Sequence, residues 1–198
     1  MALRIQSFSG AEASSYLSEI ARLRIAVFRE YPYLYDGSDA YEWEYLATYT
    51  QSPGSVVVVA FDGDKIIGAS TGLPMEDETP NVQAPWVQNG YPVGRIFYFG
   101  ESVLEQRYRG RGIGVAFFEH REAWAKTQGN FDVLTFCAVV RPENHPAKPV
   151  GYQPLNTFWE KRGFLATPFT CTMDWKEVNQ AAESTHQLQF WWKKTPII

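Results

Sequence analysis

The pattern of hydrophobic and polar positions along the chain predicts strands and helices in a mixed order. A short strand over residues 3–8 precedes an amphipathic helix over 11–29, in which apolar residues recur at three- and four-residue spacing. That helix must stop before Pro32, and a second helix is predicted from Asp39 to about Tyr49. The chain therefore begins as strand, helix, helix.

A β-hairpin gives the strongest local signal in the sequence. The buried strand 55–61 and the returning strand 65–72 flank a tight Asp-Gly-Asp turn, so the two strands must be antiparallel. The stretch 74–94 that follows holds four prolines, three acidic residues and almost no periodicity. We expect a long loop there, either functional or a plain surface insertion, and then a strand over 95–105.

The second half of the chain continues the alternation. A glycine-rich turn at 109–114 leads abruptly into a helical pattern. The later elements are a strand, a short helix that ends at Gly163, and two closing strands, predicted over 131–140, 156–162, 168–175 and 185–193. With no repeat or linker, residues 1–198 are expected to form a single mixed α/β domain.

Composition and charge limit the classes of function. The 198 residues are 45% hydrophobic, and 18 Lys and Arg against 22 Asp and Glu give a net charge of -4, which disfavours a nucleic-acid partner. No apolar run approaches the ~20 residues of a membrane span, and the first residues lack the features of a secretory signal. We expect a cytoplasmic protein without a membrane partner. Cys137 and Cys171 lie in apolar segments, which favours buried thiols over a disulfide, and no metal site is expected.

The glycine-rich turn carries the clearest chemical signal. Residues 109–114 read Arg-Gly-Arg-Gly-Ile-Gly, directly before a helix whose free N–H groups and positive dipole end attract anions. Their spacing fits neither the P-loop nor the dinucleotide-binding fingerprint. The turn is therefore predicted to bind an anion by another arrangement, with a purely structural turn as the alternative.

The turn and its context resemble the Gcn5-related N-acetyltransferase (GNAT) superfamily. Residues 109–114 match its Gln/Arg-x-x-Gly-x-Gly/Ala signature, and residues 158–164, Phe-Trp-Glu-Lys-Arg-Gly-Phe, resemble the end of its fourth helix. The predicted order of strand, two helices, three strands, helix, strand, helix and two strands is also the family order. The resemblance implies an α/β (α+β) fold with a mixed, mostly antiparallel seven-stranded sheet and helices on both faces. It also implies acetyl-CoA as acyl donor.

The resemblance indicates which residues would hold acetyl-CoA. Backbone groups of Val103 and Leu104 would bind the pantetheine arm or the thioester carbonyl between two strands that splay apart. Asn156 and Trp159 are further candidate contacts, although an asparagine at this point is also typical of a helix cap. The pyrophosphate would be held by the turn residues Arg109, Gly110, Arg111, Gly112, Ile113 and Gly114.

Catalysis requires a base for the acceptor amine, which is protonated at neutral pH. Glu101, eight residues before Arg109, is the first candidate, and Glu105 is the second. Alternation would place both on one face of their strand with Val103, unless a bulge, usual in the family, changes the parity. The alternative for each glutamate is a solvated or ion-paired side chain.

The usual general acid of the family is missing. A tyrosine four residues before the glycine of the fourth helix commonly protonates the leaving thiolate, but Trp159 stands there. Tyr152, in the long connection 141–155, is the candidate replacement, and unassisted departure of the thiolate is the alternative.

On the acceptor side, aromatic and acidic residues alternate over 31–45, which would suit a cationic amine, although the aromatic residues could also fill the core. The resemblance implies an N-acetyltransferase that acetylates a primary amine of a small molecule or peptide by direct attack in a ternary complex. A non-catalytic acyl-CoA-binding or regulatory module is the alternative. Residues 190–192, Phe-Trp-Trp, are interpreted first as strand core and second as the surface of a possible homodimer.

Overall fold

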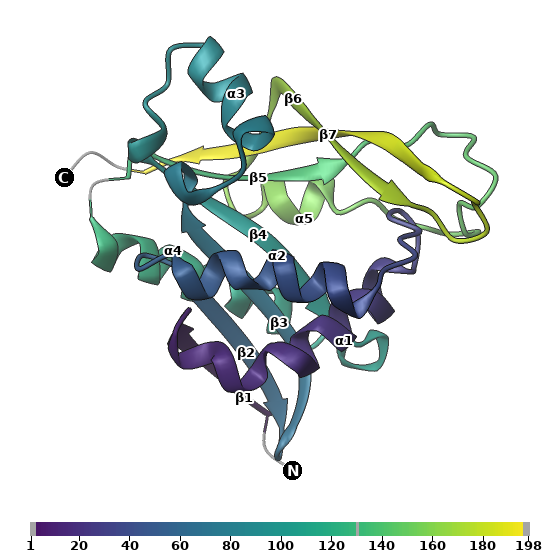
Figure 1. Ribbon diagram of the computed structural model, residues 1–198, viewed down its shortest axis with the longest axis horizontal. Coiled ribbons are helices and arrows are strands. Elements are labelled where there is room, and N and C mark those ends of the chain that lie inside the picture. The colour runs from purple at the N-terminus through teal and green to yellow at the C-terminus, as the bar shows by residue number, and fades with distance from the viewer. Residues whose placement is uncertain (1–2, 130, 196–198) are drawn as a thin grey trace.

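Strands from the whole length of the chain meet in one open sheet (Figure 1). The computed structural model describes residues 3–129 and 131–195, and in this part of the chain seven strands pair in the order β1-β2-β3-β4-β5-β7-β6. They are β1 (Leu3–Ser9), β2 (Val56–Asp62), β3 (Lys65–Pro74), β4 (Ile96–Leu104), β5 (Val133–Val139), β6 (Leu165–Lys176) and β7 (Glu183–Lys194). Only the β4–β5 pair is parallel, so the expected mixed, mostly antiparallel sheet is confirmed.

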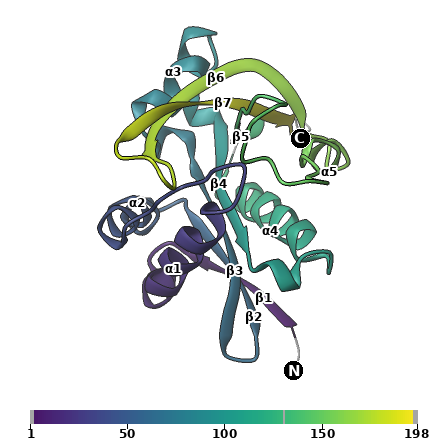
Figure 2. The ribbon, with the colours of Figure 1, turned by 90° about the vertical axis from the view of Figure 1, so that its right-hand side faces the viewer.

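Helices cover both faces of this sheet, as predicted (Figure 2). They are α1 (Leu17–Phe28), α2 (Asp39–Gln51), α3 (Pro80–Gln88), α4 (Ile113–Gln128) and α5 (Asn156–Glu160). The first two lie on one face, and α4 and α5 lie on the other. No helix in the described ranges is long and apolar enough to cross a membrane.

Two hydrophobic cores result, one on each face, and the central strands supply both. Along β2, Val57 and Val59 point to the α1–α2 side, and Val58 and Ala60 point to the α4 side. A strand buried on both faces reads as a continuous apolar run, which explains the strong signal at residues 55–61. The aromatic residues 190–192 of β7 likewise alternate between the two cores, which confirms their interpretation as strand core.

The prediction of a long loop at residues 74–94 is wrong, because most of this stretch is helical. Pro80 begins α3, where its missing N–H costs no hydrogen bond. Trp86 is fully buried, and its ring centroid lies 5.5 Å from that of Phe190 in β7. Contacts with β6 and β7, which local periodicity does not encode, hold the helix despite Pro85 in its interior.

Other elements follow the predicted order with shifted ends. The helix predicted over 11–29 begins as a 3-10 helix, Glu12–Tyr16, before α1. Strand β6 begins at Leu165, and its register on β7 shifts between Ala166 and Thr170. Pro168 lies within that shift, and a proline is tolerated there because β6 is an edge strand.

Candidate active site

The centre of the candidate site is the place where β4 and β5 separate. These strands pair only through Ile96↔Val133, Phe97↔Leu134 and Tyr98↔Thr135, and no further pair joins them in the described part of the chain. The rest of β4, including Val103 and Leu104, stays paired with β3 on its other side. The separated edges therefore offer backbone N–H and C=O groups to an extended ligand, as the resemblance implies.

The three glycines of the turn before α4 have two different roles. Gly110 and Gly112 have φ values of 76° and 83°, which strain any residue with a Cβ, and nothing lies within 4 Å of the place that a Cβ would take. Gly114 has an ordinary backbone, but a Cβ there would lie 3.4 Å from the ring of Phe158 in α5. Two glycines thus shape the turn, whereas a Cβ at the third would make only an ordinary van der Waals contact with α5.

This turn fits a phosphate group. The open space above it lies at the N-terminus of the 16-residue helix α4, where free N–H groups and the helix dipole favour an anion. Arg111 lies over the ring of Tyr108, 5.3 Å from its centroid. Arg109 donates from Nε to the carbonyl oxygen of Leu104 at 3.3 Å, and its Nη2 pairs with Glu30 Oε2 at 2.9 Å. Arg109 therefore links the turn to the end of β4.

A β-bulge aims Glu101 at the opposite face from α4. Ser102 pairs with Ser70 and Phe99 pairs with Gly72, so β4 has one residue more than β3 between these pairs. The extra residue reverses the alternation, and Glu101 therefore contacts α1 and α2. The sequence analysis allowed for a bulge in this strand, and the bulge is present. Glu101 and Val103 lie on the same face of β4, as predicted, and this face is the α1–α2 side.

Gly100 makes this bulge possible. A Cβ at this position would lie 1.9 Å from the hydroxyl oxygen of Tyr49 and 2.6 Å from Thr71 Oγ1. The backbone N–H of Glu101 donates to Thr71 Oγ1 at 3.3 Å. The missing side chain thus leaves room for the hydroxyl that reaches the Glu101 carboxylate.

The Glu101 carboxylate is buried and asymmetrically bound. Its Oε2 accepts from Arg24 Nη1 at 2.9 Å, from the Tyr45 hydroxyl at 2.9 Å and from the Tyr49 hydroxyl at 3.5 Å. Burial raises the pKa of both tyrosines well above the ordinary value, so they donate as neutral hydroxyls. Glu101 Oε1 is buried and has no hydrogen-bond partner among the described residues. A buried oxygen of this kind is a place where a ligand can donate a hydrogen bond.

Arg24 links Glu101 to a second buried carboxylate. Its Nε donates to Glu42 Oε2, and its guanidinium stacks on the ring of Tyr45, 3.9 Å from the centroid. Burial raises the pKa of Glu42. Two carboxylates thus share one guanidinium between α1, α2 and β4.

A second buried arginine reaches the bulge from the other face. Arg121 of α4 is 2% exposed, and its Nη1 donates to the carbonyl oxygens of Thr71 and Glu101, each at 3.3 Å. No carboxylate pairs with it within the described ranges. Burial lowers the pKa of Arg121 to about 9.

The other predicted site residues are spread over the molecule. Glu105 lies beyond the end of β4 and pairs with Lys65 Nζ at 2.6 Å and with Arg107 Nε at 3.0 Å, which matches the ion-paired alternative. Tyr152 is half-buried with its ring against Tyr31, 4.7 Å between centroids, and burial raises its pKa. No hydrogen bond joins it to Glu101 in the part of the chain that the structure describes.

The two candidate cofactor residues of α5 lie on the α4 side. Asn156 is the exposed first residue of this helix, and no side-chain capping bond is formed there, so it is not the cap. Trp159 packs with its ring centroid 5.0 Å from Phe136 and 4.9 Å from Trp191. The residue at the usual tyrosine position therefore forms part of a hydrophobic core.

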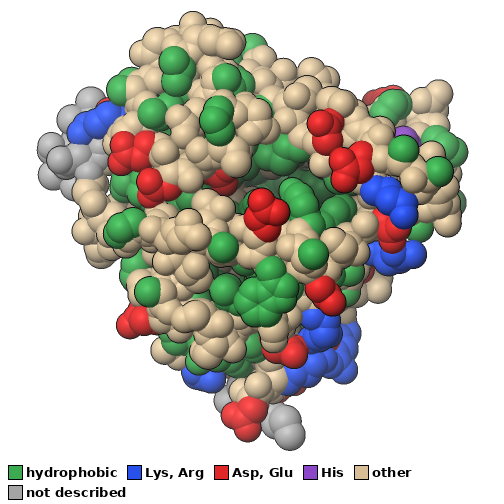
Figure 3. Space-filling model, in the orientation of Figure 1, with side chains coloured by type: hydrophobic (Ala, Val, Ile, Leu, Met, Phe, Trp, Pro, Cys, Tyr) green, Lys and Arg blue, Asp and Glu red, His purple; other side chains and the backbone are tan. Residues whose placement is uncertain are grey.

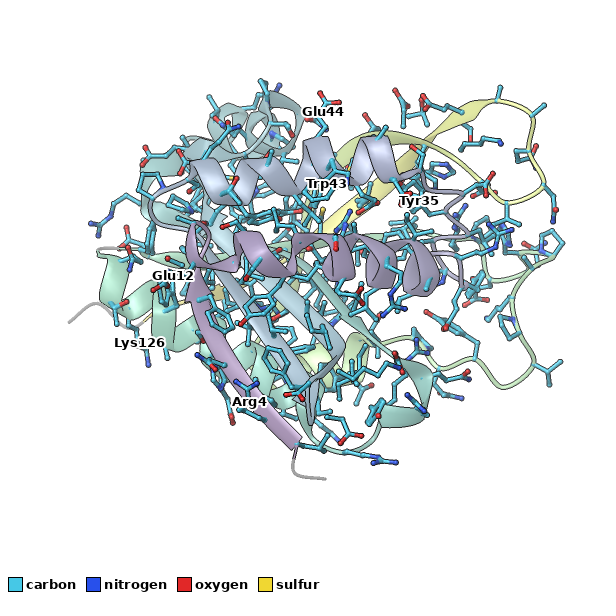
Figure 4. The ribbon with its side chains drawn as sticks, turned by 60° about the horizontal axis from the view of Figure 1, so that its bottom comes forward. Arg4, Glu12, Tyr35, Trp43, Glu44 and Lys126 are labelled. Atoms are coloured by element: carbon cyan, nitrogen blue, oxygen red, sulfur yellow. The ribbon has the colours of Figure 1, made fainter. Side chains whose placement is uncertain are left out.

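The face predicted to take the acceptor is hollowed between α2 and β7, with hydrophobic side chains inside the hollow and acidic ones at its edge (Figure 3). Glu44 of α2 is exposed and points away from the sheet (Figure 4). A small pocket between α2 and the β6–β7 hairpin is lined by aromatic, polar and charged residues: Tyr35, Asp36, Ser38, Tyr41, Asp174, Trp175, Lys176 and Glu183. Among the aromatic residues of 31–45, Tyr45 packs against the core, as the core-filling alternative predicts, whereas Tyr41 is half-exposed.

Sequence reasoning missed the two arginines that hold Glu101. Each lies on the apolar stripe of its helix: Arg24 among Leu17, Ile20, Ala21 and Phe28, and Arg121 among Phe117, Phe118 and Ala125. A charged residue on the buried face of a helix needs a buried partner. An arginine at an apolar position of the helical pattern was therefore a signal for a buried polar site. The partner itself is too distant in the sequence for the pattern to name it.

Comparisons with known proteins agree with this geometry. The model of the acetyltransferase (GNAT) family matches residues 20–164, and no curated protein gives a significant match. A GNAT-family acetyltransferase from Streptococcus pneumoniae is 15% identical, with a TM-score of 0.59 and coverage of 98% of this chain and 100% of that chain. A GCN5-related N-acetyltransferase from Kribbella flavida is 17% identical, with a TM-score of 0.60 and coverage of 98% of both chains.

A third structure contains the cofactor. It is yncA from Salmonella typhimurium with acetyl-CoA, which is 14% identical with a TM-score of 0.60 and coverage of 100% of this chain and 96% of that chain. Within the described ranges, no group of three or more His, Cys, Asp or Glu side chains is arranged to hold a metal ion. At these identities the solved structures establish the fold, and the family model establishes membership: the chain belongs to the acetyltransferase (GNAT) family, which implies acyl transfer from acetyl-CoA.

Proposed function

We propose that the protein transfers the acetyl group of acetyl-CoA to a primary amine of a small molecule or peptide, by direct attack in a ternary complex. One observation carries the proposal: the separated part of β4 offers free backbone groups beside a buried carboxylate that has an unpartnered oxygen. These are the two features that the reaction needs, a place for an extended thioester and a base for the amine.

Residues on both sides of the separation would hold acetyl-CoA, which supplies the activated acetyl thioester when bound. Val103 and Leu104 would bind the pantetheine arm through their backbone. The turn would bind the pyrophosphate through the N–H groups at the start of α4, because two of its glycines have positive φ and open space above them. Asn156 at the exposed start of α5 remains a proposed contact.

Glu101 would act as the general base. An ammonium acceptor must lose one proton before its nitrogen can attack, and Oε1 is the oxygen of Glu101 that is free to take it. The N–C bond would then form and the C–S bond would break; the thiolate would take its proton from Tyr152, and the second proton of the nitrogen would restore the Tyr152 hydroxyl. Glu101 returns its proton to solvent, so each turnover releases one proton.

Tyr152 is the proposed acid for the thiolate. Burial raises its pKa, which keeps the hydroxyl protonated at neutral pH. A covalent acyl-enzyme through Cys137 is not proposed, because the neighbouring Cys171 thiol and burial raise the pKa of Cys137 well above its ordinary value. A thiol that stays protonated is a poor nucleophile.

The test is release of free thiol from acetyl-CoA across polyamines, aminoglycosides, amino acids and peptide N-termini, with wild type and Glu101→Gln. We expect turnover with at least one amine and a loss of about 100-fold or more in the variant. Glu119→Gln, at an exposed position on α4, is the matched control and should retain activity. Binding of acetyl-CoA without turnover on any amine would instead indicate a non-catalytic module, and full activity of Glu101→Gln would remove Glu101 as the base.

A further inference from the structure

We propose that two buried arginines, Arg24 and Arg121, are positioning residues that hold Glu101 from opposite faces of the sheet. Arg24 orients its carboxylate, and Arg121 fixes its backbone at the bulge. This inference rests on the proposed role of Glu101 as base. Neither arginine is assigned to acetyl-CoA or to the acceptor.

Arg24 decides which carboxylate oxygen is free. Its Nη1 occupies Oε2 at 2.9 Å, on the same oxygen that Tyr45 binds, so Oε1 alone is left to the substrate. Arg24 is itself immobilised, because Glu42 accepts from its Nε and the ring of Tyr45 stacks on its guanidinium.

Charged and titratable groups from several elements face Glu101. They are Arg24 of α1, Glu42, Tyr45 and Tyr49 of α2, Glu78 before α3, and Arg121 of α4. Arg24 is the cation in direct contact with the carboxylate, so its removal should have a large effect on the base.

The bulge in β4 gives a reason for the burial of the Arg121 guanidinium. Burial of a guanidinium without a carboxylate is unfavourable, and an apolar side chain of similar length would fill the same space without that penalty. What the guanidinium adds is hydrogen bonds to the carbonyl oxygens of Thr71 and Glu101, which lie on the two strands at the bulge. A bulge interrupts the regular ladder of backbone hydrogen bonds between β3 and β4, and the two bonds from Arg121 join the strands at that point. Arg121 thus fixes the direction in which the Glu101 side chain leaves the strand.

Both roles predict a loss of kcat without a loss of acetyl-CoA binding. In Arg24→Gln, kcat should fall tenfold or more while the Kd of acetyl-CoA stays within twofold, because the carboxylate loses the contact that orients it. Arg24→Lys should recover part of this loss, because a lysine keeps the charge but lacks the planar guanidinium that donates to both Glu42 and Glu101. In Arg121→Met, kcat should fall tenfold or more while the Kd of acetyl-CoA stays within twofold, and Arg121→Lys should recover part of the loss.

Matched controls lie on the same two helices. Arg22→Gln removes an exposed arginine of α1, and Lys126→Gln removes an exposed lysine of α4 (Figure 4). Both should behave as wild type in every measurement. The stoichiometry of acetyl-CoA binding reports the folded fraction of each variant, so a folding defect is separated from a positioning defect.

Two measurements do not need turnover. Urea denaturation of Arg24→Gln, Glu101→Gln and the double variant should give losses of stability that are not additive, because the two side chains contact each other. Hydrogen exchange of peptides that cover β4 should become faster in Arg121→Met than in Lys126→Gln. Additive losses of stability together with wild-type kcat in Arg24→Gln, or wild-type kcat in Arg24→Lys if Arg24→Gln does not fold, would overturn the role of Arg24. Unchanged kcat and exchange in Arg121→Met would overturn that of Arg121. Full turnover by Glu101→Gln would remove Glu101 as the base, and an absence of turnover on every amine would refute the proposed function, whereas these two physical measurements would still decide the contacts.

Discussion

The absence of a side chain at Gly100 should be essential to the candidate site. In Gly100→Ala, the new Cβ would lie 1.9 Å from the Tyr49 hydroxyl oxygen, 2.6 Å from Thr71 Oγ1 and 3.0 Å from Tyr49 Cζ. Tyr49 is fully buried, so its ring cannot simply swing into solvent. Either the ring or the β4 bulge must move, and both movements displace Glu101.

The cost can be estimated from these contacts. Overpacking of a buried site costs about 1–3 kcal/mol, and each weakened hydrogen bond of the Tyr49 hydroxyl adds about 1 kcal/mol. We therefore expect a loss of about 2–4 kcal/mol in the free energy of unfolding, or roughly 5–15 °C in Tm for a chain of this size. The reduced flexibility of the unfolded chain offsets only about 0.4–1 kcal/mol of this.

Urea denaturation measures this loss, and a double-mutant cycle assigns it. Tyr49→Phe removes the hydroxyl that the new Cβ meets, so it should be less harmful in the Gly100→Ala background than alone, with a coupling energy of about 1 kcal/mol or more. Gly94→Ala is the control, because a Cβ there meets only the end of the Glu76 side chain, at 3.2 Å. Effects that add within about 0.5 kcal/mol, or a Gly100→Ala protein as stable as Gly94→Ala, would refute the steric reasoning.

Three further predictions concern other parts of the site and the fold. Gly112→Ala, at φ 83°, should lose about 1–2 kcal/mol of stability and bind acetyl-CoA at least tenfold more weakly by calorimetry, whereas Gly114→Ala should keep its affinity; equal affinities would contradict the role of the turn. Hydrogen bonds from Arg95 lower the pKa of Asp132 in the folded protein. The ionised carboxylate therefore stabilises the fold at pH values above the pKa of an unfolded aspartate, about 4. This stabilisation is lost as the pH falls through the lower pKa of the folded state. The Tm of Asp132→Asn should therefore fall less than that of wild type between pH 5 and pH 3, and parallel curves would contradict this. Tyr152→Phe should lower kcat about 100-fold if this hydroxyl protonates the thiolate, and an unchanged kcat would favour unassisted departure.

Much of the molecule was predictable because its signals are local. The run of valines predicted the buried strand β2, and the glycine-rich turn at 109–114 predicted the start of a helix. Glu101 was identified as the candidate base from its place on the strand before that turn. The stretch 74–94 was misjudged, because α3 depends on the contacts of Trp86 with β6 and β7 rather than on its own periodicity.

The sequence by itself determined the glycine turn and the order of the elements other than α3, since each depends on neighbours within a few residues. Only the tertiary structure decided that Glu101 lies between Arg24 and Arg121, with one oxygen bound and one free. The reason is physical. A buried charge is tolerated only when the fold brings it a partner, and a hydrophobic pattern records that a position is buried without recording what faces it across the sheet.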